Sequence, residues 1–395
     1  MAMKSIEELE LEGKRIFIRP DLNVPLDSTG IITDDTRIRA SLQTIRYVIR
    51  KGGRAIVASH LGRPKGKHVE SMSLMPVAKA LSELLERDVI MAPDCIGDGV
   101  RVVANQLKES EVMLLENLRF HPGEEANDPE FSKKLAELAD VYINDAFGCS
   151  HRAHASIVGV PTIIKEKAAG FLLRKEIRYF ERALSDPDRP LIAVLGGAKV
   201  TDKIPVIQNL LTKVDALLIG GGMAYTFLAA QGIYVADSLV DKSKLLIAQE
   251  ILLEAENKRV PIMLPVDHIV SSEAKEGSPK RIIRNDGFKS GDKGLDIGPE
   301  TAKQFAEKIA KSKTIIANGP MGVFEIPEFS EGTFSVMRAI ANSGALSIIG
   351  GGDSVAAAAA AGVTDKITHI STGGGASLEM LEGKEFPGIV SLQTD

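Results

Sequence analysis

Polar and charged residues able to hold an anion recur at the ends of apolar segments in the first half of the chain. Asp21 and Asn23 follow RIFIRP, His60 and Arg63 lie in SHLGRP, Arg119 lies in LLENLRF, and His151, Arg152 and His154 lie in SHRAHAS. Each group alone has a simpler interpretation as a turn or a capped loop. Arg37, in TDDTRIRAS, has a simpler interpretation as a solvated helix charge. Because several such groups fall in one half of the chain, we predict an anion-binding site there.

Glycine follows the apolar segments of the second half, at Gly196–Gly197, Gly220–Gly222, Gly350–Gly352 and Gly373–Gly375. Glycine lets backbone N–H groups approach a phosphate, and a helix N-terminus adds partial positive charge. In GGAKVTDKI, Lys199 and Lys203 are four residues apart at the expected start of a helix, so both can project from one face. They could also be ordinary surface lysines. We predict a site for a phosphorylated cofactor.

Two acidic positions in this half could complete such a site. Asp353 and Ser354 follow three glycines in GGGDSVAAA; they are good helix caps, but a carboxylate beside backbone N–H groups also suits Mg²⁺ bound to nucleotide phosphates. Glu325, in NGPMGVFE, is either a surface acid or a partner of a ribose hydroxyl.

Several known nucleotide and metal motifs are missing from the sequence. No Gly-Lys pair has the spacing of a Walker A loop, H-R-D and D-F-G are absent, and the glycine triplets lack the third glycine of a dinucleotide-binding fingerprint. The spacing of His151 and His154 is not that of a helical zinc site, and no thiolate pair accompanies them, which disfavours zinc there.

The composition indicates a globular protein with no general attraction to polyanions. The chain has 395 residues, 44% hydrophobic and 26% charged, with a net charge of −5, so we expect neither nucleic acid nor membrane as a partner. Two cysteines, Cys95 and Cys149, indicate free thiols in a reducing compartment. With no apolar leader and no long apolar segment, we expect a cytoplasmic protein.

The elements that must position these residues alternate as strand, loop and helix. Short β-branched segments separated by helical periods indicate βαβ units and a parallel sheet covered on both faces. At ERALSDPDRP prolines and aspartates precede LIAVLGG, where a second series of strands begins. We therefore predict an α/β fold with two doubly wound parallel-sheet (Rossmann-like) domains joined by a hinge, the first over 1–185 and the second over 186–380.

The ordered set of motifs resembles the phosphoglycerate kinase family in its bacterial form. RPDLNVP, SHLGRP, LLENLRFH, NDAFGCSHRAHAS, GGAKVTDKI, GGGMAYTFL, GLDIGPE, NGPMGVFE, GGGDSVAA and STGGGASLE occur in the family's order and at about its spacing, over essentially the whole chain. Departures such as Pro20 before Asp21, and Gln43 where the family often has proline, fall outside the positions that carry chemistry.

The resemblance implies a phosphotransferase with a carboxyl group as acceptor, which moves a phosphoryl group between 1,3-bisphosphoglycerate and ADP to give 3-phosphoglycerate and ATP, in glycolysis and gluconeogenesis. It implies that the acid substrate is held by Asp21, Asn23, Arg37, His60, Arg63, Arg119 and Arg152. It implies that the nucleotide contacts Lys203, Gly221, Gly222, Gly294, Leu295, Glu325, Gly351, Gly352, Asp353 and Ser354, with Asp353 on Mg²⁺.

The resemblance also implies a monomer that closes about its hinge, with segment 381–395 returning to the N-terminal domain. Since phosphoryl transfer depends on positioning and charge stabilisation, no nucleophilic side chain is needed. We expect Arg37, Lys199, Lys203, Gly373 and Gly374 to surround the moving group.

Two other functions remain open at this point. One is a nicotinamide-dependent dehydrogenase on two α/β domains, which would use NADH as a direct substrate. The other is a non-catalytic nucleotide-binding module, against which the presence of Arg37, Lys199, Lys203 and Asp353 argues.

Overall fold

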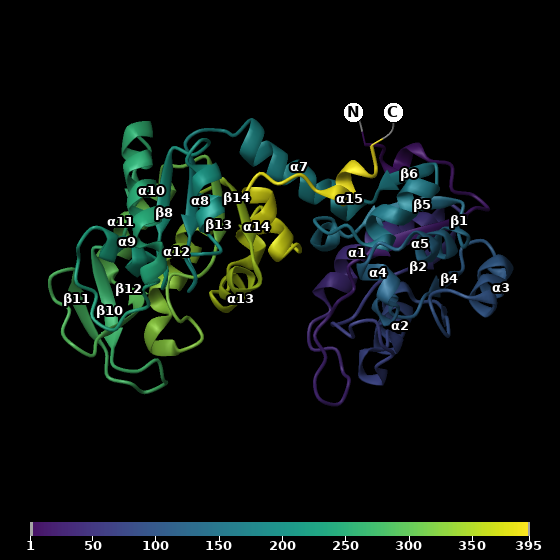
Figure 1. Ribbon diagram of the computed structural model, residues 1–395, viewed down its shortest axis with the longest axis horizontal. Coiled ribbons are helices and arrows are strands. Elements are labelled where there is room, and N and C mark those ends of the chain that lie inside the picture. The colour runs from purple at the N-terminus through teal and green to yellow at the C-terminus, as the bar shows by residue number, and fades with distance from the viewer. Residues whose placement is uncertain (1–2, 394–395) are drawn as a thin grey trace. The chain divides into compact units, whose positions relative to one another are not determined.

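The computed structural model describes residues 3–393 and divides the chain into two compact units (Figure 1). The first unit contains the residues up to Arg178 together with the segment that begins at Glu385, and the second runs from Tyr179 to Lys384. The division falls inside helix α7 (Phe171–Ser185), whose last residue is the position of the predicted boundary.

The first unit is built on a parallel six-stranded sheet with the strand order β3-β4-β2-β1-β5-β6. The strands are β1 (Arg15–Pro20), β2 (Arg54–Val57), β3 (Val89–Met91), β4 (Val112–Leu114), β5 (Val141–Asp145) and β6 (Glu166–Ala169). The chain leaves β1 toward β2 on one side and returns to β5 on the other. Loops at the carboxyl ends of strands diverge at such a reversal, which makes this edge the usual ligand site of an open α/β sheet.

Helices cover this sheet because their apolar residues recur every three or four positions. Helix α1, for example, buries Ile38, Leu42, Ile45 and Ile49 against the strands. The helices of the first unit are α1 (Thr36–Arg50), α2 (Met75–Leu85), α3 (Asp98–Gln106), α4 (Pro122–Glu125), α5 (Pro129–Ala136), α6 (Val160–Ile163), the start of α7, and α15 (Pro387–Val390).

The C-terminal segment packs on the first unit. The Gly388 N–H donates to Ser150 O at 2.9 Å, and the Asn144 side chain donates to Gly388 O at 3.3 Å. The rings of Phe147 and Phe386 lie 5.8 Å apart. These contacts account for the grouping of the segment that begins at Glu385 with the N-terminal half of the chain.

The second unit contains a second parallel sheet, with the order β15-β14-β13-β7-β8-β9. Its strands are β7 (Leu191–Leu195), β8 (Ala216–Ile219), β9 (Ile262–Met263), β13 (Thr314–Asn318), β14 (Leu346–Gly350) and β15 (His369–Ile370). Strand β7 lies between β8 and β13, so the strand order reverses here as well. The predicted α/β class with two doubly wound parallel sheets is confirmed.

The second unit also holds a small antiparallel sheet that the sequence interpretation missed. Its order is β11-β10-β12, with β10 (Asp267–Ser271), β11 (Arg281–Arg284) and β12 (Lys293–Ile297). The segment VPIMLPVDHIV, expected to be one strand of the parallel series, is therefore two strands in two sheets, divided by Pro265. Figure 1 shows this sheet on the side of the unit away from α14.

The helices of the second unit flank its parallel sheet. They are the end of α7, α8 (Ile204–Leu210), α9 (Ala224–Ala230), α10 (Leu245–Lys258), α11 (Pro299–Ala310), α12 (Glu331–Asn342), α13 (Gly352–Ala360) and α14 (Gly375–Leu381). Most of the alanine run at 356–361 belongs to α13, where Ala357 and Ala358 are buried against the core.

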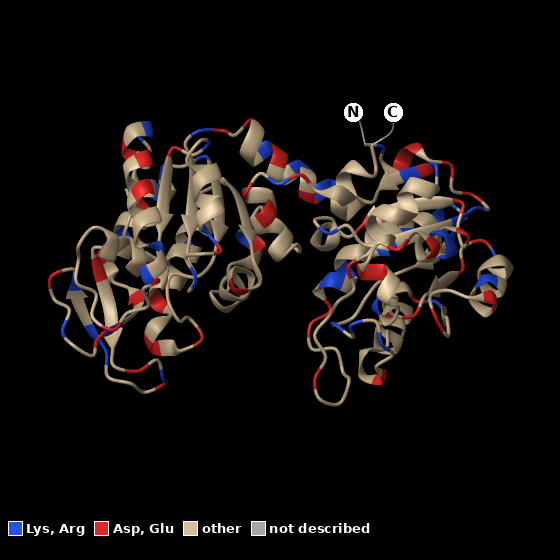
Figure 2. Cartoon of the chain, viewed as in Figure 1, with Lys and Arg blue, Asp and Glu red and all other residues tan. Residues whose placement is uncertain are grey.

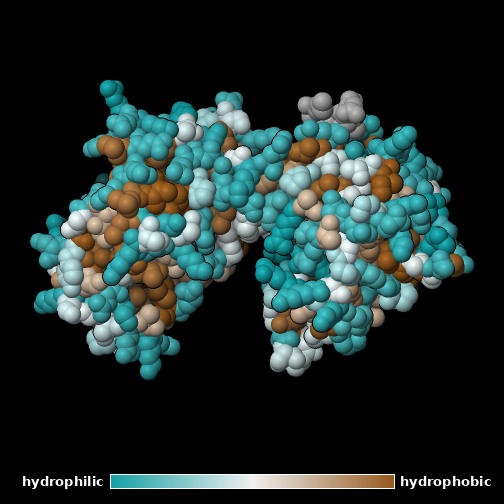
Figure 3. Space-filling model, in the orientation of Figure 1, coloured by the Kyte–Doolittle hydropathy of each residue, from teal (hydrophilic) through white to brown (hydrophobic). Residues whose placement is uncertain are grey.

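The surface of each unit mixes both signs of charge. Figure 2 shows acidic and basic residues interspersed along the helices, and Figure 3 shows hydrophobic patches within a mostly hydrophilic face. Among residues 3–393, no helix combines the length and the apolar character needed to cross a bilayer.

Candidate active site

The predicted anion-binding residues of the first unit meet at one edge of its sheet. Strands β1, β2, β4 and β5 are parallel, so their carboxyl ends lie together. The loops after these strands carry Asp21 and Asn23, His60 and Arg63, Arg119, and His151 and Arg152, in that order. Arg37 comes from the first turn of α1.

Arg37 is held by the loop that follows β1. Its Nη1 donates to Asp21 Oδ2 at 3.1 Å and to Asn23 O at 3.0 Å, and its side chain keeps 33% of its surface exposed. The Asn23 Oδ1 accepts the N–H of Gly62 at 2.8 Å, which ties this loop to SHLGRP. Three of the predicted motifs therefore form one connected group.

His60 lies buried beneath these loops beside Arg19. The Arg19 Nη2 and His60 Nδ1 are 3.4 Å apart, and the guanidinium also donates to Ser156 Oγ at 2.7 Å and Pro20 O at 2.6 Å. Burial, with Arg19 and Arg119 nearby, lowers the pKa of His60 well below its usual value. His60 is therefore neutral at physiological pH and can act as a hydrogen-bonding group.

Arg119 is buried as well, with 4% of its side-chain surface exposed. Its Nη1 donates to Gly62 O at 2.9 Å, and its Nε lies 3.5 Å from Glu125 Oε1. Burial lowers the pKa of Arg119 from its ordinary value, although an arginine remains charged. A buried cation with few acidic neighbours favours the binding of an anion from solution.

Arg63 and Arg152 complete the basic cluster. Arg63 is exposed, and Arg152 donates through Nε to His151 Nε2 at 3.0 Å. Burial, with Arg119 and Arg19, lowers the pKa of the neighbouring His154 to about 3, so this ring adds no charge. The cluster can bind the anionic groups of a small molecule.

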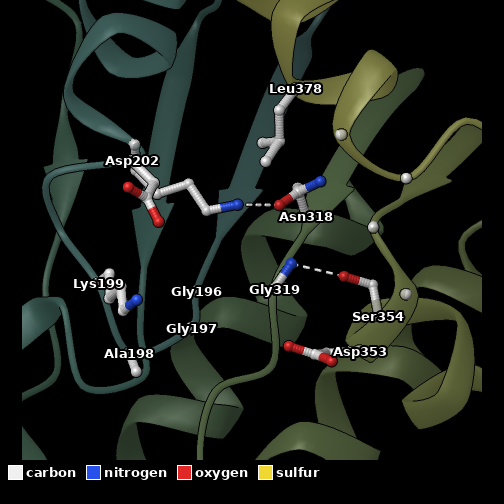
Figure 4. Close-up of a pocket in the computed structure, with 15 residues that line it drawn as sticks. Gly196, Gly197, Ala198, Lys199, Asp202, Asn318, Gly319, Asp353, Ser354 and Leu378 are labelled. Atoms are coloured by element: carbon white, nitrogen blue, oxygen red, sulfur yellow. Dashed lines mark hydrogen bonds between the residues drawn. The ribbon is translucent and has the colours of Figure 1, made fainter. Parts of the chain in front are cut away.

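In the second unit a cavity of about 390 Å³ opens at the carboxyl ends of β7, β13 and β14 (Figure 4). It is lined by Gly196, Gly197, Ala198, Lys199, Asp202, Lys203, Asn318, Gly319, Gly351, Gly352, Asp353, Ser354, Gly374, Gly375 and Leu378. Most of the lining comes from the predicted glycine loops.

The two lysines line this cavity from a turn that precedes the helix. Helix α8 begins at Ile204, with Lys203 as its N-cap, so the expectation that both lysines project from the helix is wrong. The Pro205 ring fits the first turn of a helix and explains the late start. Lys199 is exposed, while burial lowers the pKa of Lys203 to about 8 against the raising effects of Asp202 and Asp353.

Asn318 is a residue of the site that the sequence interpretation did not single out. Its side chain accepts a hydrogen bond from Lys203 Nζ and donates to Gly350 O at 2.8 Å. It thereby connects the lysine to the glycine loop after β14. Asn318 lies at the end of an apolar strand, directly before Gly319-Pro320, and this position could have marked it in the sequence as a site residue.

The loop after β14 brings backbone N–H groups and a carboxylate to the cavity. Gly351 has a φ of 92°, a conformation that favours glycine, and α13 begins at Gly352. Asp353 is exposed in the first turn of α13, whereas the Ser354 hydroxyl is buried and accepts the N–H of Gly319 at 2.5 Å. Asp353 and Lys203 therefore face one cavity from two loops, as Figure 4 shows for Asp353.

The remaining predicted nucleotide contacts lie outside this cavity but in the same unit. Gly221 donates to Met321 O at 3.0 Å, and Leu295 O accepts the N–H of Val323 at 2.9 Å. A side-chain carbon on Gly294 would overlap the Tyr225 hydroxyl, and one on Gly222 would touch Leu239. Glu325 is exposed, and Gly373 precedes the lining residue Gly374 and donates to Ser371 Oγ at 3.1 Å.

The chain is similar to known proteins over essentially its whole length. The family model described as "Phosphoglycerate kinase" matches residues 6–384. A protein named phosphoglycerate kinase from Anaeromyxobacter dehalogenans is 54% identical over 395 residues, which is the full length of both chains. One of the same name from Moorella thermoacetica is 54% identical over 392 residues and 99% of each chain.

Solved structures give the same result. The structure of phosphoglycerate kinase from Coxiella burnetii matches with a TM-score of 0.91 and 42% identity, over 99% of each chain. The phosphoglycerate kinase from Pyrococcus horikoshii matches with a TM-score of 0.86 and 37% identity, over 99% of this chain and 98% of that one.

Proposed function

The chain belongs to the phosphoglycerate kinase family, and we propose that each unit holds one substrate of the reaction. The reaction is the reversible transfer of a phosphoryl group between 1,3-bisphosphoglycerate and ADP, which gives 3-phosphoglycerate and ATP in glycolysis. The observation that carries the proposal is that the two kinds of site lie in different units. The basic cluster lies in the first unit, and the glycine-lined cavity with Lys203 lies in the second.

The first unit binds the acid substrate. The arginines supply planar pairs of N–H donors that match phosphate and carboxylate oxygens. His60, kept neutral by burial, supplies a hydrogen bond without adding charge. The residues that we assign to this substrate are Asp21, Asn23, Arg37, His60, Arg63, Arg119 and Arg152.

The second unit binds the nucleotide. Lys203 and the loop from Gly351 to Ser354 hold its phosphates, because they bring a cation and helix N–H groups to one cavity. Gly221, Gly222, Gly294, Leu295 and Glu325 hold the nucleoside. Side chains on the three glycines would meet Gly197, Leu239 and Tyr225, so glycine lets these segments pack closely and form the wall against which a base can lie.

The transferring group needs donors where its negative charge develops. Arg37, Lys199 and Lys203 supply cations, and the backbone of Gly373 and Gly374 at the start of α14 supplies dipoles. Transfer is direct and needs both substrates bound at once, so we include closure about a hinge in the proposal.

The donor set around Asp353 fits Mg²⁺. This ion is usually held by one or two carboxylates together with phosphate oxygens and water, and Asp353 is an exposed carboxylate beside the proposed phosphate loop. The ion would neutralise charge on the nucleotide phosphates.

Asp353→Asn should raise the Mg²⁺ concentration needed for half-maximal rate and leave 3-phosphoglycerate binding unchanged.

The cavity offers a matched control in Asp202, a second exposed carboxylate of the same lining. Asp202→Asn should leave the Mg²⁺ dependence close to that of the unaltered protein. An unchanged dependence in Asp353→Asn would make Asp353 a helix cap and not a metal ligand.

We also propose that the protein acts as a monomer in the cytoplasm, without nucleic acid or membrane as a partner. Each proposed binding site is made entirely by one chain, and glycolysis supplies both substrates in solution. Light scattering after size-exclusion chromatography tests the oligomeric state.

The experiment that tests the function is a coupled assay. Purified protein, ATP, Mg²⁺ and 3-phosphoglycerate should form an acyl phosphate that a coupled reductase detects through NADH oxidation. Omission of 3-phosphoglycerate or ATP should abolish the signal. NADH oxidation without the reductase would instead support a dehydrogenase, and nucleotide binding without turnover would support a non-catalytic module.

A further inference from the structure

We propose that Asp94, Cys95 and His121 form a binding site for zinc or a similar divalent transition metal in the first unit. Their ligand atoms, one from each side chain, all lie within 4.8 Å of one another. Thiolate, imidazole and carboxylate are the three side-chain ligands that zinc takes in proteins, and three protein ligands leave a fourth position for water. The site is separate from the residues assigned to either substrate.

The distances allow an ion to enter with small side-chain movements. Zinc bonds of about 2.0–2.3 Å in a tetrahedron place neighbouring donor atoms about 3.3–3.7 Å apart. His121 Nε2 and Asp94 Oδ1 are now 2.7 Å apart, in direct contact, so they must separate by about 1 Å or less. The Cys95 sulfur lies within 4.8 Å of both, so these two side chains must also move toward it by about 1 Å. Both side chains are partly exposed, 28% for His121 and 45% for Asp94, so this separation is open to them.

The protein supplies the three ligands from two segments, the loop of Asp94 and Cys95 and the loop of His121. The Cys95 N–H donates to Asp94 Oδ1 at 2.6 Å, and Ala92 N–H donates to Leu114 O at 2.8 Å, which anchors the segment to β4. The His121 ring stacks on Phe131 with 5.4 Å between ring centres. Cys95 is fully buried, so the thiol forms the inner wall of the site, and the exposed side chains form its entrance.

The local charge favours a cation here and disfavours one at the other comparable cluster. Cys95 faces the carboxylate of Asp94, with that of Glu124 nearby. Asp21, His60 and Cys149 also bring three ligand atoms together, but Arg19, Arg37 and Arg119 surround that group and repel a metal ion. This contrast assigns the metal to Cys95 and not to Cys149, the second thiol of the chain.

Binding exchanges a proton for the ion. The Cys95 S–H bond breaks, the sulfur electron pair forms the bond to the metal, and the proton goes to the buffer. The bond between the metal and a thiolate gives Co²⁺ a characteristic near-ultraviolet absorption, which makes Co²⁺ a suitable probe for this site.

The test is a titration of the full-length, reduced protein with Co²⁺, followed by competition with Zn²⁺. We expect one equivalent of Co²⁺ to produce the thiolate absorption and Zn²⁺ to remove it. Cys95→Ser should abolish the band, while Cys149→Ser, the matched control, should retain it. His121→Gln and Asp94→Asn, which alter partly exposed side chains and so disturb folding least, should each weaken Co²⁺ binding at least tenfold.

Three results would overturn the proposal: no thiolate absorption in the unaltered protein, a band that survives in Cys95→Ser, or a band that disappears only in Cys149→Ser. If Cys95→Ser does not fold, the Co²⁺ affinities of His121→Gln and Asp94→Asn test the site instead. Unchanged Co²⁺ affinity in both would reject the site.

Discussion

Arg37 is the residue of the basic cluster whose role in catalysis is most open to measurement. Its Nη1 is fixed by Asp21 and Asn23, and a third of its side-chain surface is exposed. A guanidinium oriented before the substrate binds loses little entropy on meeting an anion. Such a group stabilises a transition state if charge develops within its reach.

Arg37→Ala should lower kcat by about 10²–10³, the typical loss when one preorganised donor is removed. The Kd of the nucleotide should stay nearly constant, because the proposed nucleotide site lies in the other unit. Steady-state kinetics and separate titrations of each ligand measure both quantities. Arg39→Ala is the control, since Arg39 lies on the same helix but is 60% exposed and pairs with Asp35 at 2.8 Å.

A different pattern would change the assignment of Arg37. If kcat is retained and only the KM for 3-phosphoglycerate rises, Arg37 binds the ground state and does not act on the transition state.

Lys203 should make nucleotide binding sensitive to alkaline pH. Burial lowers its pKa to about 8, so the free protein loses this positive charge as the pH rises through 8. The Kd of MgADP should therefore be constant below about pH 7.5 and should rise toward tenfold per pH unit above pH 8. Calorimetry between pH 6.5 and 9.5 measures this.

Two lysine variants separate Lys203 from its neighbour. Lys203→Arg keeps a charge throughout this range, so the alkaline rise in Kd should disappear even if absolute affinity falls. Lys199→Gln should weaken binding and keep the rise. A Kd that is flat to pH 9.5 in the unaltered protein would mean that Lys203 stays protonated.

The sequence could predict the residues at strand ends but not their buried partners. Asp21, His60 and Arg119 follow apolar strands, and parallel pairing necessarily brings such positions to one edge. Arg19 pairs with Ser156, 137 residues away, and Lys203 with Asn318, 115 residues away. Contacts at such separations depend on the packed fold, and no local pattern encodes them.

At the scale of elements, the antiparallel strand β12 determines where the proposed nucleoside contacts lie. Asp296, on β12, has 1% of its surface exposed; its Oδ2 accepts the N–H of Gly332 at 2.7 Å and its Oδ1 that of Ile297 at 2.9 Å. Gly332 lies in the first turn of α12. A side-chain carbon on Gly322 would overlap this carboxyl group, so the loop before Glu325 packs against it too.

Asp296 is not among the proposed nucleotide contacts, but Asp296→Ala should weaken nucleotide binding by disturbing the segments that carry those contacts. It leaves two buried N–H donors unpaired, each at a cost of about 1–3 kcal/mol in the free energy of unfolding. Denaturant unfolding measures the stability, and calorimetry with MgADP measures the Kd, which should rise while 3-phosphoglycerate binding is unchanged.

The control for Asp296 is a second buried carboxyl group at a helix start. Asp267 accepts the N–H groups of Glu300 at 3.0 Å and Thr301 at 2.8 Å, at the beginning of α11. Asp267→Ala should lower stability by a similar amount and leave the Kd of MgADP nearly constant. Equal effects of the two variants on that Kd would mean that Asp296 acts only through general stability.

Helices and strands could be predicted where one hydrophobic pattern dominated their sequence. The buried parallel strands are continuous apolar runs such as LIAVL and ALLI, which leave few alternatives. The small antiparallel sheet was missed because β11, RIIR, is short and largely exposed, and a strand of this kind carries little apolar signal. The late start of α8 depends on Pro205 and on the turn that contains Lys199, which the lysine spacing does not reveal.

At the scale of the whole molecule, we propose that each of the two units binds one substrate. This proposal can be tested in the intact chain. A ligand that binds only the native form of its own unit slows the local opening of that unit, by about 100-fold when its concentration is about 100 times its Kd. Amide hydrogen exchange reports such opening segment by segment. The two ligands should therefore protect different parts of one protein.

We expect 3-phosphoglycerate alone to slow exchange in segments 21–24, 60–66 and 119–125, which carry the basic cluster. MgADP alone should slow exchange in segments 197–203, 319–323 and 351–354, which line or adjoin the cavity. MgADP and 3-phosphoglycerate together cannot transfer a phosphoryl group, so the pair gives a stable complex in which both sets should be protected. Mass spectrometry of peptides from the exchanged, full-length protein measures exchange in all three states.

Protection of segments 21–24 and 60–66 by MgADP alone, with none at 197–203, would contradict the assignment of one substrate to each unit. Protection of neither set by either ligand, at concentrations that saturate turnover, would place the substrates on other residues.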